Sequence, residues 1–218
     1  MSQDRIRTLA PRVPFHDHDG EKVLGQVESH WRNLRANQLV PNRADIGLGV
    51  LSLVLGHTFV LERVTPSVAR FRVAGQAIHS MLNMEPRGMP ISAIFTPMGR
   101  QMLAPLIYDV CEGPELVEIP LIAQRGLARS PLRARLLMLP IRTIGDEINA
   151  IFGALVVDGR AGRRSIRFDF DVESELRTEV LSPAIRTVHE VIDEPVPTPP
   201  IQSFAVKRPG LRLVVDNT

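Results

Sequence analysis

Two strongly apolar segments separated by a short turn constrain the fold of this chain more than any other feature. Residues 132–143 include the run Arg-Ala-Arg-Leu-Leu-Met-Leu-Pro-Ile, and residues 149–157 end in Ala-Ile-Phe-Gly-Ala-Leu-Val-Val. Gly145 and Asp146 lie between the two segments and favour a turn. The pattern therefore predicts two strands that pair as an antiparallel hairpin.

The rest of the central region predicts further strands and helices. Residues 57–64 and 68–74 are rich in β-branched and aromatic types and flank the turn Thr65-Pro66-Ser67, so they favour a second hairpin. Residues 115–124 form a third strand candidate. Helical spacing of apolar residues predicts short helices at 46–55 and 76–83 and a longer helix at 98–111, which Pro105 should kink or delay. The predicted order is helix, two strands, short helices, one longer helix and three strands.

The first helix of this order is amphipathic. Within residues 21–35, apolar side chains recur at spacings of three, four and three, at Leu24, Val27, Trp31 and Leu34. This seam has to be covered, either by the rest of the same domain or by the same helix of another subunit. We treat it as the candidate dimerisation or interaction helix.

The segments outside this region differ in composition. Residues 1–20 show no periodicity and suggest a disordered leader. Residues 159–194 form an extension in which residues 166–172 alternate between apolar and charged types, as in a half-buried strand, and residues 176–194 suggest a helix interrupted at Pro183. Residues 195–218 begin with a proline-rich stretch and are interpreted as a tail.

Composition and charge exclude several classes of protein. With 44% apolar and 23% charged residues, the chain is not wholly disordered. Its formal charge of +2 does not imply a nucleic-acid partner. Cys111 is the only cysteine, so an intramolecular disulfide cannot form and a reducing, cytoplasmic location is expected. No apolar run approaches the roughly 20 residues of a membrane-spanning helix.

Five short motifs suggest a family. They are Ser29-His30-Trp31-Arg32-Asn33-Leu34-Arg35, Val40-Pro41-Asn42-Arg43-Ala44-Asp45, Phe59-Val60-Leu61-Glu62, Phe71-Arg72-Val73-Ala74-Gly75-Gln76 and Pro86-Arg87-Gly88. Together with the element order, they resemble a PAS-like domain family of alphaproteobacteria over residues 21–158. The resemblance implies an α+β, PAS-like fold: a five-stranded antiparallel sheet with helices on one face, plus the N-terminal amphipathic helix. It also implies a regulatory or sensory module, and it supplies no catalytic residue.

A cavity between the sheet and the helices of residues 76–111 is the expected place for a small ligand. The candidate ligand-binding residues are His79, Phe95, Met102 and Leu106. No cofactor is expected, although PAS proteins that hold haem have their cavity in this region, so His79 is the candidate axial ligand if haem is bound.

Other chemistry has weaker support in the sequence. His16-Asp17-His18-Asp19 contains metal-ligand types in the leader, but no preorganised metal site is expected there. Cys111 has no cationic neighbour in the sequence, which favours a buried thiol over a nucleophile. Arg129 and Arg133 have the Arg-x-x-x-Arg spacing of cyclic-dinucleotide-binding PilZ domains, but the Asp-x-Ser-x-x-Gly partner motif is missing. No catalytic motif is present, so we expect no enzyme.

These observations lead to one main hypothesis and two alternatives. The main hypothesis is a stand-alone PAS-like regulator that acts through a homodimer or through another signalling protein. It includes the option that binding of a small ligand controls this contact. The first alternative is a sensor that retains haem or another small molecule. The second is a PilZ-like regulator that binds a cyclic dinucleotide.

Overall fold

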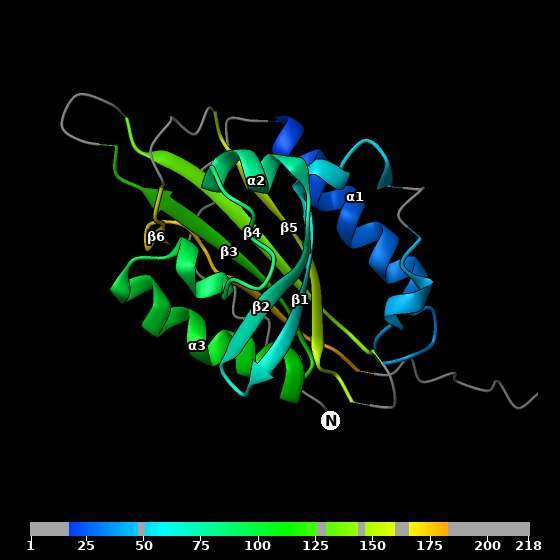
Figure 1. Ribbon diagram of the computed structural model, residues 1–218. Coiled ribbons are helices and arrows are strands. Elements are labelled where there is room, and N and C mark those ends of the chain that lie inside the picture. Colours follow the sequence, from blue (N-terminus) through cyan, green and yellow to red (C-terminus); the bar gives the residue numbers. More distant parts are fainter. Residues whose placement is uncertain (1–17, 48–50, 126–129, 144–146, 160–165, 183–218) are drawn as a thin grey trace, which may run out of the picture. The chain divides into compact units, whose positions relative to one another are not determined.

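The computed structural model describes residues 18–47, 51–125, 130–143, 147–159 and 166–182. An antiparallel sheet organises these residues (Figure 1). Its strands are β1 (Thr58–Thr65), β2 (Val68–Ala74), β3 (Glu115–Ala123), β4 (Leu132–Ile141), β5 (Ala150–Val157), β6 (Asp169–Phe170) and β7 (Arg177–Val180). The order across the sheet is β2-β1-β5-β4-β3, and β6 and β7 both pair with the far edge of β3. The predicted five-stranded sheet is confirmed, and the two short strands extend it.

The apolar hairpin lies in the middle of the sheet. β4 pairs with the whole of β5, from Ala134 opposite Val157 to Ile141 opposite Ala150. Because successive side chains of a strand point to opposite faces, a nearly continuous apolar run requires cover on both faces. Both faces are covered here: Leu136 belongs to one buried cluster and Leu137 to another.

Helices supply the two covers. They are α1 (His18–Arg35), α2 (Gln76–Leu82) and α3 (Pro97–Glu112), with the 3-10 turns η1 (Arg43–Asp45), η3 (Leu55–His57) and η4 (Ile91–Ile94). α2, η4 and α3 share a core with one face of the sheet, which we call the inner face. α1 shares a core with the other, the outer face. Figure 1 shows α1 beside the sheet and away from α3.

The longer helix begins where a helix cap can form. Thr96 precedes α3, its hydroxyl oxygen accepts a hydrogen bond from the Gly99 N–H at 3.2 Å, and Pro97 occupies the first helical position. Pro105 does not delay the helix, since α3 begins at Pro97 and continues to Glu112.

Two predicted helices are wrong in the described residues. Residues 51–57 form turns and η3 rather than an α-helix, and their hydrogen bonds run from the Val54 N–H to the Leu51 oxygen and from the His57 N–H to the Val54 oxygen. The glycines at positions 47 and 49 reduce the helix propensity of this segment. Residues 177–180 form β7 instead of a helix, because the free edge of β3 offers backbone partners that outweigh local preference.

The alternating segment before β7 is confirmed only in part. Phe168 and Phe170 are buried in the inner core as predicted, but β6 is only two residues long and Val172 is 84% exposed. Asp171 ends the strand, since its carboxylate accepts hydrogen bonds from the Glu173 N–H and the Ser174 hydroxyl. A turn therefore replaces the last part of the predicted strand.

Two glycines from the family-like motifs are required for different reasons. Gly88 has φ +82°, a conformation that favours glycine. Gly75 has an ordinary φ, but a Cβ atom there would lie 2.1 Å from the Leu55 carbonyl oxygen. Gly75 thus allows the segment before β1 to approach the end of β2.

Candidate functional site

Large side chains fill the space between the inner face of the sheet and the helices. Phe59, Phe71, Phe95 and Phe168 are each at most 1% exposed, and Phe59 and Phe71 meet edge to face with ring centroids 5.9 Å apart. This is the region in which the sequence predicts a ligand cavity.

Of the four predicted ligand-binding residues, two belong to the inner core and two are more exposed. Phe95 is fully buried in the inner core, and Leu106 packs at its margin. Met102 is 39% exposed on α3. The Nε2 atom of His79 lies 3.2 Å from the Ala74 carbonyl oxygen, and its Nδ1 atom lies 3.6 Å from Glu85. To bind haem iron, His79 would have to give up one of these two contacts.

Two small hollows in the described part of the chain are lined by none of these four residues. One, of about 310 Å³, lies between α2 and the end of β5 and is lined by His57, Ser80, Met81 and Leu155 among others. The other, of about 290 Å³, lies beside the segment that joins α1 to β1 and is lined mainly by apolar side chains, together with Thr58 and Arg43. We call them the α2 hollow and the Arg43 hollow.

The predicted interaction seam is covered within the same chain. Leu24, Val27 and Trp31 are at most 4% exposed and pack on the outer face of β4 and β5, and only Leu34 is partly exposed. The indole N–H of Trp31 donates to the Pro140 carbonyl oxygen at 3.0 Å. Of the two ways to cover the seam that the sequence left open, this structure shows the intramolecular one.

The polar side of α1 is tied to β7 by a network of ion pairs. Arg177 donates two hydrogen bonds to the carboxylate of Glu28, at 2.7 and 2.9 Å. Arg32 donates to Glu179, with one contact at 3.0 Å, and to Glu28 at 2.9 Å. We call these four residues the α1–β7 latch.

The latch continues onto the strands below α1. Arg177 also donates to Glu118 of β3 at 3.3 Å, and Arg135 of β4 donates to Glu118 at 3.1 Å. Arg35, at the end of α1, donates to the Ser182 carbonyl oxygen. The C-terminal extension therefore holds both the sheet edge and the helix that covers the outer face.

The charges in the latch change the pKa values of its members. Burial alone would raise the pKa of Glu28, but hydrogen bonds and charges from Arg177 and Arg32 outweigh it and lower the pKa. The hydrogen bond from Arg32 lowers the pKa of Glu179. The hydrogen bond to Glu28 raises the pKa of Arg177. Each carboxylate of the latch is thus held in its charged form.

Other candidates from the sequence find no site in the described residues. Residues 16 and 17 and Arg129 lie outside them, and within them no group of three or more His, Cys, Asp or Glu side chains could hold a metal ion. Cys111 is buried, and this burial raises the pKa of its thiol. Arg133 lies 3.7 Å from Asp171. No helix in the described part of the chain is both long and apolar enough to cross a membrane.

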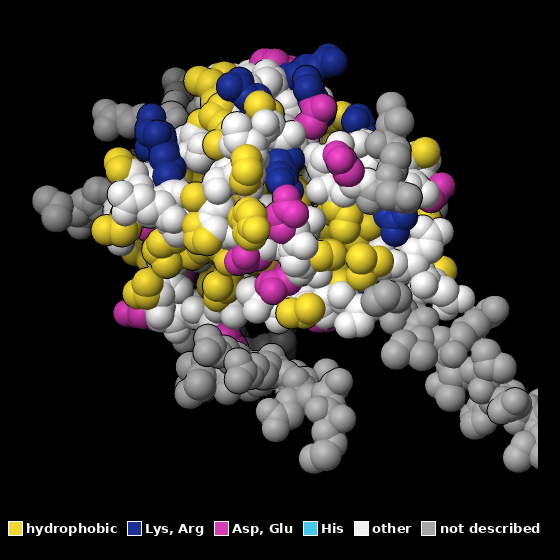
Figure 2. Space-filling model, turned by 90° about the horizontal axis from the view of Figure 1, so that it is seen from below, with side chains coloured by type: hydrophobic (Ala, Val, Ile, Leu, Met, Phe, Trp, Pro, Cys, Tyr) yellow, Lys and Arg dark blue, Asp and Glu magenta, His cyan; other side chains and the backbone are white. Residues whose placement is uncertain are grey.

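Exposed apolar side chains are spread over the surface. The largest exposures are at Leu53, Val172, Val180 and Met98. Figure 2 shows several groups of hydrophobic side chains on the face seen from below, interrupted by charged and polar ones. The exposed side chains alone therefore do not mark one docking surface.

The sheet order, the two packed faces and the helices of the inner face define an α+β domain of the PAS type. A family model described as a PAS domain matches residues 21–156, so the chain belongs to the PAS domain family. This membership suggests a sensory or regulatory role, which PAS domains generally have in place of catalysis. Searches of curated proteins and of solved structures found no match.

The residues of the latch are not among the site residues predicted from the sequence. Glu28 and Arg32 are four residues apart in a predicted helix, which is a visible signal for an ion pair within α1. Arg177 and Glu179 gave no such signal, because their strand forms only when β3 offers its edge.

Proposed function

We propose that this PAS domain is a regulatory module that acts by binding a second copy of itself, and that α1 is the element that moves to make this contact. The observation that carries the proposal is the way α1 is attached. Its apolar side covers the outer face of the sheet, and its polar side is held by partly exposed ion pairs to β7.

The latch is suited to reversible release. The side chains of Arg177, Arg32 and Glu179 are 37–40% exposed, and ion pairs at this exposure contribute about 0–1 kcal/mol each because water and salt screen them. A change of a few kcal/mol is therefore enough to free the polar side of α1. The apolar outer face of β4 and β5 is uncovered only when the apolar side of α1, with Leu24, Val27 and Trp31, detaches as well.

A second copy is the partner that fits this surface best. The seam of α1 and the outer face of the sheet are already complementary within one chain, so the same two surfaces can pair between two chains. Residues 36–57 connect α1 to β1 and provide the length for such an exchange. Another signalling protein that offers an amphipathic helix would use the same face.

The latch can be tested without disturbing the apolar seam. In Arg177→Glu, repulsion from Glu28 should open the latch, so amide hydrogen exchange in residues 18–35 should accelerate and the dimer fraction should rise in light scattering. Arg72→Glu is the matched control, since Arg72 pairs with Glu62 on the β1–β2 hairpin. The double variant Glu28→Arg, Arg177→Glu should recover part of the slow exchange.

Two outcomes would contradict the proposal. Unchanged exchange in α1 would show that the latch does not hold the helix. Faster exchange without any self-association at high protein concentration would rule out a second copy as the partner. Substitution of Leu24 or Trp31 is a less informative test, since both side chains are buried in the chain's own outer core.

A ligand-gated sensor is the second candidate function. It is supported by the two hollows, each of which lies beside a helix or turn that covers the sheet. Native mass spectrometry of the freshly purified protein would show a retained ligand as added mass, and an absorbance spectrum would show haem. A protein with neither would contradict a tightly retained cofactor.

A further inference from the structure

The walls of the Arg43 hollow are almost entirely apolar, so a ligand there would make mainly apolar contacts. Ile46 and Leu55 come from the segment between α1 and β1, and Val60, Val73 and Phe152 come from the sheet. Two polar groups in the wall already have partners: the Thr58 hydroxyl donates to the Leu55 oxygen at 3.1 Å, and the Gly75 N–H donates to the Thr58 oxygen at 2.8 Å. A ligand therefore has to place an apolar group in this part of the hollow.

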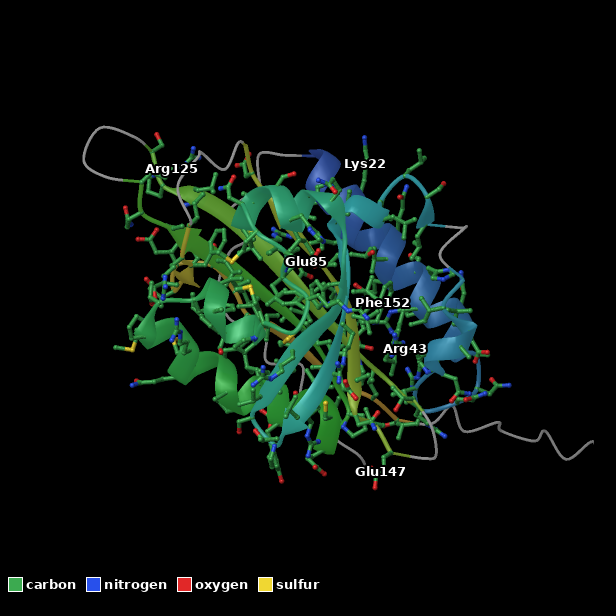
Figure 3. The ribbon with its side chains drawn as sticks, viewed as in Figure 1. Lys22, Arg43, Glu85, Arg125, Glu147 and Phe152 are labelled. Carbon is green, nitrogen blue, oxygen red and sulfur yellow. The ribbon has the colours of Figure 1, made fainter. Side chains whose placement is uncertain are left out.

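Arg43 supplies the one charge among the described lining residues. It is exposed, and its planar guanidinium group can donate several hydrogen bonds in one plane. Figure 3 labels Arg43 and Phe152 on the side of the sheet where α1 lies. The hollow thus combines an apolar wall with a cationic group that water can reach.

The size of the hollow limits the guest to a small molecule. A volume of about 290 Å³ corresponds to roughly ten water-sized groups at about 30 Å³ each. This volume is too small to enclose a whole nucleotide. It suits an aliphatic chain whose polar head group stays at the opening of the hollow.

We infer that the Arg43 hollow binds a small amphipathic carboxylate, with the carboxylate at Arg43 and the aliphatic tail against Val60, Val73 and Phe152. The α2 hollow is the weaker candidate for such a ligand, because its described lining contains no Arg or Lys to receive a carboxylate.

A ligand bound in the Arg43 hollow would affect the packing of α1. Val60 and Phe152 belong to the outer core on which α1 packs, and the Arg43 N–H donates to the Arg142 oxygen just after β4 at 2.8 Å. A carboxylate held here contacts both the connection from α1 and the sheet. This consequence rests on the ligand-gated candidate function, whereas binding itself does not.

Decanoate is a suitable probe of the full-length protein. Titration monitored by methyl NMR should shift the signals of Ile46, Leu55, Val60 and Val73. Arg43→Glu should weaken binding about tenfold, the size expected when a hydrogen-bonded charge partner is lost. Arg87→Glu is the matched control, since Arg87 is exposed and does not line the hollow. Decan-1-ol, which has no charge, should bind more weakly than decanoate to the wild type.

A second variant tests the hollow itself and leaves the charge of Arg43 unchanged. Val73→Trp should fill the hollow and abolish the shifts, because Val73 is 47% exposed and can take a larger side chain without disturbing the core. Val64→Trp is its control, on a residue of β1 that is also exposed and lies outside the hollow. The inference is overturned if decanoate shifts the signals of Met81 and Leu155 instead, or if neither Arg43→Glu nor Val73→Trp changes binding. If decanoate binds as expected but exchange in α1 is unchanged, the site stands and the gating of α1 fails.

Discussion

Trp31 and Pro140 are 109 residues apart in the chain, yet the indole N–H of Trp31 donates to the Pro140 carbonyl oxygen at 3.0 Å. Pro140 is near the end of β4, and Trp31 is fully buried on α1. This hydrogen bond satisfies the polar atom of a side chain that otherwise makes apolar contacts. It therefore sets the position of α1 along the sheet as well as its depth.

Replacing Trp31 with Phe should destabilise the protein by about 1–3 kcal/mol. The change removes the indole donor, leaves the Pro140 oxygen without this partner and opens a small gap in the outer core. Urea unfolding followed by circular dichroism measures the effect, because the variant has lost the chain's only tryptophan. A loss below about 0.5 kcal/mol, the lower end of a hydrogen bond's usual contribution, would show that the Trp31–Pro140 hydrogen bond does little to hold α1 on the sheet.

Acidification should loosen α1 through the latch. The folded-state pKa values of Glu28 and Glu179 are lowered, so their stabilisation is present above the usual value of 4.5 and is lost as the pH falls through the folded values. Trp31 fluorescence should therefore report exposure of the indole below about pH 4.5. Glu179→Gln should make the contact less dependent on pH in this range, and an unchanged profile would contradict the role of the latch.

As the pH falls, His30 should cause a loss of stability at a higher pH than the latch carboxylates do. Burial lowers its pKa from 6.5, and its Nε2 atom is buried without a hydrogen-bond partner among the described residues. The folded state favours neutral His30, so its contribution to stability is lost as the pH falls through 6.5 and below. His30→Gln should remove the pH dependence of unfolding in this upper range and leave the more acidic step, which comes from the latch carboxylates, intact.

Gly25→Ala should stabilise the protein by about 1 kcal/mol. Gly25 lies in α1, no atom would meet an added Cβ within 4 Å, and alanine is the better helix former by that amount. A higher midpoint in urea is the expected result. If release of α1 drives self-association, the same variant should also associate less.

Gly75→Ala should have the opposite effect. A Cβ atom at this position would lie 2.1 Å from the Leu55 oxygen and 2.4 Å from the Gly56 oxygen, both of which are backbone atoms that cannot rotate away. Overpacking of this kind costs about 1–3 kcal/mol. Thermal unfolding should show a lower midpoint than in the wild type, and Gly25→Ala serves as the control for a glycine in open space.

The sequence by itself determined the central domain. Apolar runs such as 132–141 and 150–157 leave few alternatives to paired strands, and the spacing of Leu24, Val27 and Trp31 defines one apolar side of a helix. These signals are local, because the period of the pattern reflects the geometry of each element. The element order and the short motifs then led to the family that the comparison confirmed.

Only the tertiary structure decided what covers the seam of α1 and where the extension goes. The same seam would suit a second subunit, and the outer face of β4 and β5 covers it here because those strands are apolar on both faces. Residues 177–180 have no strong strand preference, yet they form β7 because the edge of β3 offers hydrogen-bond partners and Glu28 and Glu118 offer charge to Arg177. Such choices depend on residues that lie far apart in the chain, so no local pattern contains them.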